Sequence, residues 1–350
     1  MKANSVSSAS ISNALRYSQG RMQVDLVKAQ KEMDTGRVAD VGLALGARTA
    51  QSVTFARDLD RLNGIVDSNA LITSRLSSTQ DALSKLVDTA QTLLAALPSA
   101  MSGDMAADLT RDNGKAALES MTSILNTSVN GEYLFAGTNT DVKPLNDFTA
   151  TGSPAKAAFD AAFLAHFGFT QDDPAAANIT AGDMDDFITN DLMPQFMGAD
   201  WQTNWSNATD QQIVSRISLN ETTETSVSAN NDGVKKLAMA AALVTDLFSS
   251  STLSAAAKKT AASRAFSLAG EAVSDLGQVQ SQTGIIENRV SAATDRMNTQ
   301  VDLFNKHILD LEGVDPYEAA NRVNDLMSHI QTSFALTARI QQLSLLNFLT

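Results

Sequence analysis

The chain has 350 residues, which is enough for two or three domains of ordinary size. It contains no cysteine, which excludes disulfides, thiolate metal sites and cysteine nucleophiles. The net charge of −13 argues against nucleic acid as a partner, because binding to phosphates requires an excess of Lys and Arg. No apolar run approaches the ~20 residues needed to span a bilayer, so we expect no membrane insertion.

The N-terminal segment predicts an amphipathic helix. Apolar residues recur there with a helical period, at Ile11, Leu15, Met22, Leu26, Ala29 and Met33. Nothing nearby in the sequence covers this stripe. Residues 1–50 carry seven basic and four acidic groups, so this part of the chain is nearly neutral.

A heptad pattern that begins at Phe55 predicts a long helix. Its two seams contain, among others, Leu59, Leu62, Val66, Leu76, Leu83, Val87, Leu94 and Leu97. The pattern stops at Pro98. We expect the helix to end there, because proline lacks an amide proton and disfavours helical geometry in the preceding residue.

Residues 141–232 differ from the rest of the chain in composition. They hold fourteen acidic and three basic residues, a net charge of −11, with half of the phenylalanines and both tryptophans. This composition predicts a small α+β insert with an acidic outer surface and its own core. Helices are expected at 155–167 and 183–197. A hairpin is expected from strands near 213–219 and 223–229, with a turn at Asn220 and Glu221.

Clustered carboxylates in the insert raise the question of a bound cation. Asp172, Asp173, Asp183, Asp185 and Asp186 could bind calcium, but their spacing lacks the glycine and the terminal Glu of a calcium-binding loop. A solvated acidic surface is the favoured interpretation. The three histidines lie far apart in sequence, so we expect no catalytic residues, no metal and no cofactor.

The C-terminal part repeats the helical pattern. A second heptad seam runs from Phe266 to Leu311 and predicts a helix that pairs with the first. A hinge is predicted where Gly313 ends this helix, Asp315 serves as an N-cap and Pro316 takes the first position of the last helix. That last helix carries an apolar stripe at Val323, Leu326, Ile330, Phe334, Ile340, Leu343 and Leu346.

The two terminal stripes predict assembly between copies of the chain. The two helices can pair, but a pair buries one narrow face of each helix and leaves apolar surface exposed. The expected interface comprises Ile11, Leu15, Met22, Leu26, Met33, Val323, Leu326, Ile330, Phe334, Ile340, Leu343 and Leu346. A membrane-surface helix is the rival interpretation, but the last 35 residues contain two arginines, balanced by two acidic residues, and no Lys-rich face.

Three motifs resemble the flagellin superfamily. Residues 130–140, read as NGEYLFAGTNT and followed by Pro144, resemble a stretch of the hook-associated protein 3 family, which joins hook to filament. The residues that carry the likeness are Asn130, Gly131, Tyr133, Phe135 and Gly137. They suggest a turn followed by a short strand. Residues 33–37 and the run from Ser333 to Leu349 resemble the terminal signatures of the superfamily.

This resemblance implies a mainly α fold, an elongated helical rod or coiled coil formed by the N- and C-terminal segments, with the small α+β insert projecting outward. The implied domains are 1–50 with 313–350, 51–140 with 233–312, and 141–232. The resemblance further implies a secreted, structural protein of the bacterial flagellum, exported by the flagellar type III apparatus with a chaperone. Its implied partners are other copies of itself, hook-associated protein 1 and flagellin. Filament flagellin is the alternative within the superfamily. An enzyme or a cation-binding activity in the insert is less favoured.

Overall fold

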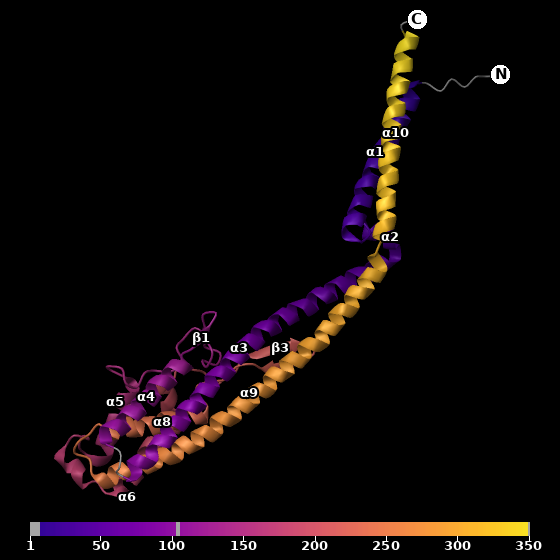
Figure 1. The fold of residues 1–350 in the computed structure, drawn as a ribbon. Coiled ribbons are helices and arrows are strands. Elements are labelled where there is room, and N and C mark those ends of the chain that lie inside the picture. The colour runs from indigo at the N-terminus through magenta and orange to yellow at the C-terminus, as the bar shows by residue number, and fades with distance from the viewer. Residues whose placement is uncertain (1–7, 103–105, 349–350) are drawn as a thin grey trace. The chain divides into compact units, whose positions relative to one another are not determined.

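The computed structural model describes residues 8–102 and 106–348 and confirms the mainly α fold (Figure 1). The helices are α1 (Ser8–Thr35), α2 (Val41–Leu45), the 3-10 turn η1 (Gly46–Arg48), α3 (Thr49–Ser102), α4 (Ala107–Leu125), α5 (Pro154–Phe167), the 3-10 turn η2 (Pro174–Asn178), α6 (Ala181–Phe187), the π turn η3 (Ile188–Leu192), α7 (Met193–Met197), the π turn η4 (Trp201–Trp205), α8 (Asp232–Leu247), α9 (Ala255–Glu312) and α10 (Pro316–Phe348). The strands are β1 (Ser128–Val129), β2 (Glu132–Tyr133), β3 (Val214–Ser218) and β4 (Glu221–Glu224), and they form two antiparallel hairpins.

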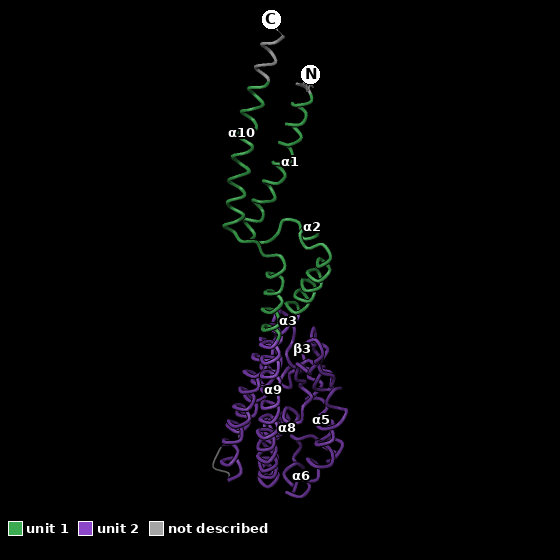
Figure 2. Tube along the Cα trace, turned by 90° about the vertical axis from the view of Figure 1, so that its right-hand side faces the viewer, with its two compact units in different colours: residues 1–64, 297–350 green, residues 65–296 purple. Residues whose placement is uncertain are grey.

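The chain divides into two compact units (Figure 2). Unit 1 comprises Met1–Gly64 and Met297–Thr350, and unit 2 comprises Ile65–Arg296. Helices α3 and α9 have residues in both units. The limits of the three domains expected from the sequence stay a prediction.

Helices α3, α4, α8 and α9 contribute apolar residues to the core of unit 2. Helices α4 and α8 approach each other closely at Gly114. A Cβ atom on Gly114 would lie 2.5 Å from Val244 Cγ2 and 2.9 Å from the Ala241 carbonyl oxygen. Gly114 therefore lets the two helices pack closely, and α8 is buried along most of its length.

Helix α3 does not end at Pro98, so that prediction is wrong. The helix continues to Ser102 with Pro98 inside it. A proline costs the helix one hydrogen bond and some crowding against the turn before it. Leu97 and Ala100 are both buried in the core of unit 2, and this burial holds the last turn in place.

Local capping signals explain the helices of the insert. The Ser153 hydroxyl accepts a hydrogen bond from the Lys156 N–H ahead of α5, and Gly168 ends that helix in a left-handed conformation at φ 77°. At α6, Thr180 and Asp183 form a reciprocal capping box. The expected helix at 155–167 is confirmed, and the expected helix at 183–197 is present as α6, η3 and α7 in succession.

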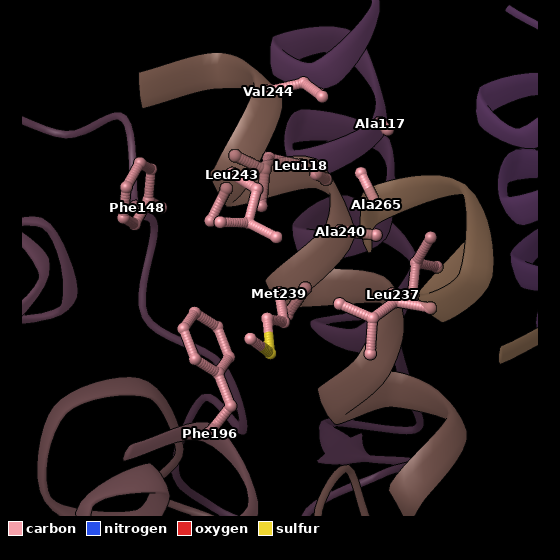
Figure 3. Close-up of a cluster of buried hydrophobic side chains, with 14 of the residues drawn as sticks. Ala117, Leu118, Phe148, Phe196, Leu237, Met239, Ala240, Leu243, Val244 and Ala265 are labelled. Carbon is pink, nitrogen blue, oxygen red and sulfur yellow. The ribbon is translucent and has the colours of Figure 1, made fainter. Parts of the chain in front are cut away.

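The aromatic residues of the insert form a packed cluster, but this cluster is continuous with the helices. Phe148 stacks on Trp205 with ring centroids 5.1 Å apart, and Trp201 stacks on Trp205 at 5.5 Å. Phe148 and Phe196 lie beside Met239 and Leu243 of α8 (Figure 3). The core of the insert is thus continuous with the core of the helices. The insert as a separate domain stays a prediction.

The β3–β4 hairpin confirms the expected hairpin with different limits. The turn lies at Leu219 and Asn220, and the second strand begins at Glu221. Asn69 on α3 donates from Nδ2 to the Ile217 carbonyl at 2.9 Å, and Arg289 on α9 donates to Glu221 at 2.8 Å. Ile217 packs with Leu76 and Val290. The hairpin is therefore held by both long helices of unit 2.

Candidate assembly surface

Helices α1 and α10 of unit 1 lie side by side and antiparallel (Figure 1). Their direction follows from two contacts, since Gln19 meets Ser333 and Glu32 meets Arg322. Shielded residues on α10 recur at spacings of four and three, as expected for a coiled-coil seam. The seam of α10 contains Ala319, Val323, Leu326, Ile330, Ser333, Thr337 and Ile340, and that of α1 contains Leu15, Gln19, Met22, Leu26 and Ala29.

A polar layer crosses this otherwise apolar seam. Gln19 is buried, and its Nε2 donates to Ser333 Oγ and to Thr337 Oγ1, each at 3.1 Å. A buried amide without a hydrogen-bond partner lowers the stability of the fold by about 1–3 kcal/mol. The layer therefore favours the register in which these three side chains meet. A shift of one heptad would place Leu326 or Ile340 opposite Gln19 instead.

The predicted hinge is braced by backbone pairing rather than being a free linker. The Val38 N–H donates to the Glu312 carbonyl at 2.8 Å, and the Val314 N–H donates to the Gly36 carbonyl at 2.9 Å. The buried Glu312 carboxylate accepts a hydrogen bond from the Ser52 hydroxyl. These bonds tie the loop after α1 to the loop before α10. Whether the joint bends stays a prediction.

The predicted start of α10 agrees with the structure. Helix α10 begins at Pro316, and Asp315 Oδ1 accepts from the Tyr317 N–H at 2.8 Å, as an N-cap does. A Cβ atom on Gly313 would lie 2.4 Å from the Leu309 carbonyl oxygen. Glycine is therefore required at the end of α9 for steric reasons, although Gly313 does not adopt the left-handed conformation.

Pairing of α1 with α10 leaves a second apolar face on each helix. On α1 this face consists of Tyr17, Val24 and Val27, with Val24 55% and Val27 64% exposed. On α10 it contains Met327 and Phe334, which lie seven residues apart; Phe334 is 51% exposed. We call these five residues the outer apolar face. Exposed apolar residues repeated at heptad spacing indicate a surface that another helix can cover.

The residues predicted as the interface divide between these surfaces. Leu15, Met22, Leu26, Leu326, Ile330 and Ile340 are half-buried and Val323 is buried, all on the seam between α1 and α10. Phe334 lies on the outer apolar face, while Ile11 and Met33 are exposed at the two ends of α1. Leu343 and Leu346 lie outside the residues whose side chains the structure describes. Tyr17, Val24, Val27 and Met327 were not predicted, because they lie off the single apolar stripe that each helix shows in the sequence.

The motif at residues 130–140 forms a tight hairpin anchored in the core of unit 2. Asn130 and Gly131 connect β1 to β2 with φ 54° and 86°, which are the positive values of a type I′ turn. The expected turn and short strand are confirmed. Beyond Tyr133, the buried Phe135 accepts a bond from the Ala229 N–H at 2.8 Å. At Gly137, with φ 65°, a Cβ atom would lie 2.4 Å from the Thr209 carbonyl oxygen.

Several acidic residues of the insert form hydrogen bonds within the protein. Asp183 caps α6, and its bonds from Thr180 lower the pKa of its carboxyl. Asp185 accepts two hydrogen bonds from Arg264, which lower the pKa of Asp185. In the described residues, no three acidic or histidine side chains gather as metal ligands do. No helix among residues 8–102 and 106–348 is long and apolar enough to cross a membrane.

Comparison with known proteins identifies the family. A sequence model of the bacterial flagellin N-terminal helical region matches residues 6–140, and one of the C-terminal helical region matches residues 266–349. Together the two matches cover more than half of the chain. The chain belongs to the bacterial flagellin family. Proteins of this family are structural and self-assemble into axial structures of the flagellum, which is extracellular, so the chain is a structural flagellar subunit.

The fold also resembles a solved structure. A provisionally assigned flagellar hook-associated protein from Vibrio parahaemolyticus matches with a TM-score of 0.51 at 10% sequence identity, over 76% of this chain and 97% of that one. At this identity the likeness concerns the fold alone. No curated protein matches the chain.

Proposed function

We propose that this flagellin-family subunit joins the hook to the filament, and that copies associate through the outer apolar face of the α1–α10 pair. The observation that carries the proposal is the second heptad stripe on each terminal helix. One pairing buries the inner seam, and Val24, Val27 and Phe334 remain exposed in a single copy. Burial of such side chains between copies supplies the free energy of association.

The assignment to the junction rests on the motif at residues 130–140. The sequence of this motif, with Asn130, Gly131 and Gly137, resembles the junction family more than filament flagellin. In this role the subunit would contact hook-associated protein 1 on one side and flagellin on the other, after export with a chaperone. Filament flagellin is the second candidate, since the terminal regions are shared by both.

Localisation tests this assignment. Flagella isolated from cells that produce the protein would be labelled with an antibody against the acidic insert and viewed by electron microscopy. We expect label at one short zone between hook and filament. Label along the whole filament would overturn the junction role and establish filament flagellin instead. Deletion of the gene should leave hooks without filaments, while flagellin appears in the medium.

A further inference from the structure

The β3–β4 hairpin has two strand edges whose backbone groups have no partner among the described residues. The Thr225 N–H donates to the Ile213 carbonyl at 2.8 Å, so residues 213 and 225 face each other across the ladder. Inward and outward backbone groups alternate along an antiparallel pair. The N–H and C=O groups of Val214 and Arg216 therefore point away from β4, and those of Thr222 and Glu224 point away from β3.

The edge of β3 borders an open groove of about 740 Å³. Four consecutive residues, Gln212 to Ser215, line this groove. Successive side chains of a strand point to opposite faces, so a groove on one face is lined by every second residue. A groove lined by consecutive residues therefore follows the edge of the strand. Its other walls include Leu71 of α3 and Val129 of β1, and Val214 is 63% exposed.

The edge of β4 borders a second groove, of about 480 Å³. Three consecutive residues, Thr222 to Glu224, line it together with Gln282, Ile285 and Arg289 of α9. Ile285 is exposed, as Leu71 and Val214 are at the first groove. Each edge thus combines unpaired backbone groups with an uncovered apolar side chain, the combination that natural proteins usually avoid on a strand edge.

Each of the two strands carries one exposed charged side chain outside the ion pairs of the described residues, and these two charges are opposite in sign. Arg216 on β3 is exposed in an insert that is otherwise strongly acidic, and its guanidinium donates to the Leu219 carbonyl at 2.7 Å. Glu224 on β4 is exposed as well. Neither side chain forms an ion pair within the described residues. Arg75 at the β3 groove pairs with Glu132, and Arg289 at the β4 groove pairs with Glu221. The unpaired charges therefore make a β3 edge complementary to a β4 edge, but not to a second β3 edge.

We propose that the β3 edge of one copy pairs antiparallel with the β4 edge of the next copy, and that the hairpins of neighbouring copies form one intermolecular sheet. Two different surfaces meet in this contact, so it is a head-to-tail interface that continues from copy to copy as a ring or a helical array. The strands are short, and a single contact is weak. It adds to the association of the terminal helices, which holds neighbouring hairpins at high local concentration. This inference rests on the proposed assembly of copies.

Cysteine cross-linking tests the contact directly, because the chain has no cysteine of its own. Cells would produce Arg216→Cys and Glu224→Cys copies together, and isolated flagella would be oxidised mildly and analysed for disulfide-linked dimers. We expect dimers when both variants are present and almost none with either variant alone, since positions 216 and 216 of neighbours are not adjacent head to tail. Val142→Cys mixed with Glu224→Cys is the control, because Val142 is exposed and lines neither groove. Both variants incorporated without mixed dimers would overturn the inference.

Charge reversal provides a second test. Cross-strand charge pairs contribute roughly 0.2–1 kcal/mol each and like charges cost a similar amount, so Arg216→Glu or Glu224→Arg should lower incorporation into flagella about 2- to 30-fold. The double variant should regain most of the loss, because each new arginine meets a new glutamate of its neighbour. A double variant no better than the single ones would refute the pairing. Antibody label along the whole filament would change the proposed function from junction protein to filament flagellin. It would not affect the cross-linking and charge-reversal results, so the proposed function and the proposed strand pairing can be refuted separately.

Discussion

Replacing Phe334 with Ser tests whether the outer apolar face drives association. Phe334 is 51% exposed in a single copy, so about half of its side chain remains to be covered. Full burial of a phenylalanine is worth about 1.5–3 kcal/mol, which leaves about 0.8–1.5 kcal/mol for contact with a neighbour. That loss corresponds to roughly a 4- to 13-fold rise in the concentration at which copies assemble. The other half of the side chain is already covered within a single copy, so the isolated chain should lose a similar amount of stability, roughly 1 kcal/mol. The control variant below is chosen to match this loss.

The assay compares full-length variants by sedimentation of assembled protein and by the amount recovered in isolated flagella. Leu303→Ser is the matched control, because Leu303 on α9 has the same exposed fraction of 51% but lies outside the terminal pair. Phe334→Leu should retain most of the assembly. Equal effects of Phe334→Ser and Leu303→Ser would refute the reasoning, as would normal assembly of Phe334→Ser.

Three further predictions concern stability. Gly137→Ala should destabilise unit 2 by more than Gly168→Ala, as measured by urea unfolding. Both glycines have positive φ, which costs an alanine about 1–2 kcal/mol, but only at position 137 would the new Cβ atom lie 2.4 Å from Thr209. Equal effects would contradict the packing argument. Gln19→Ala should lower the free energy of opening of the α1–α10 pair by about 1–2 kcal/mol and so speed amide hydrogen exchange in both helices. Substitution of the exposed Gln23 with Ala is the control and should leave exchange unchanged. Unchanged exchange in Gln19→Ala would show that the polar layer has no role. Arg264 lowers the folded-state pKa of Asp185, so the ion pair stabilises the fold fully above the unfolded pKa of about 3.9, and this stabilisation is lost as pH falls through the folded pKa. The difference in stability between the native chain and Asp185→Asn should therefore shrink below about pH 4. A difference that does not depend on pH would refute the pairing.

Burial raises the pKa of Asp246, so the contribution of this group to stability changes with pH in the opposite direction to that of Asp185. Its folded state binds a proton more readily than the unfolded chain does. Acidification through the folded pKa therefore adds stability through Asp246 while it removes stability through Asp185. Lys156 partly offsets the cost of the buried carboxylate, at a distance of 2.7 Å.

The sequence predicted those features that depend on local chemistry. Asp315 and Pro316 start α10 as expected, because an N-cap and a first-turn proline act within a few residues. The Asn130–Gly131 turn was likewise predictable, since two adjacent positive φ values favour this pair of residues. Heptad spacing was enough to predict the long helices and the pairing of the chain's two ends.

Features that depend on tertiary contacts were not predictable from a single sequence. Helix α3 passes through Pro98 because Leu97 and Ala100 are buried on the other side of it, which the local pattern does not show. Gln19 and Ser333 were overlooked because a polar residue interrupts an apolar stripe, although they meet across the seam. The core shared between insert and α8 depends on which surfaces fold against each other, and composition alone suggested a separate domain.

Accessibility of the outer apolar face before and after assembly tests the central claim most directly. Single cysteines would replace Val24 and Phe334 in the cysteine-free chain, and their rates of maleimide labelling would be compared between the isolated subunit and intact flagella. Both positions should react readily in the isolated subunit, since both side chains are exposed. In flagella we expect strong protection at both positions, with Val142→Cys still reactive as a surface control. Equal labelling of Val24→Cys and Phe334→Cys in the two states would contradict assembly through the terminal helices.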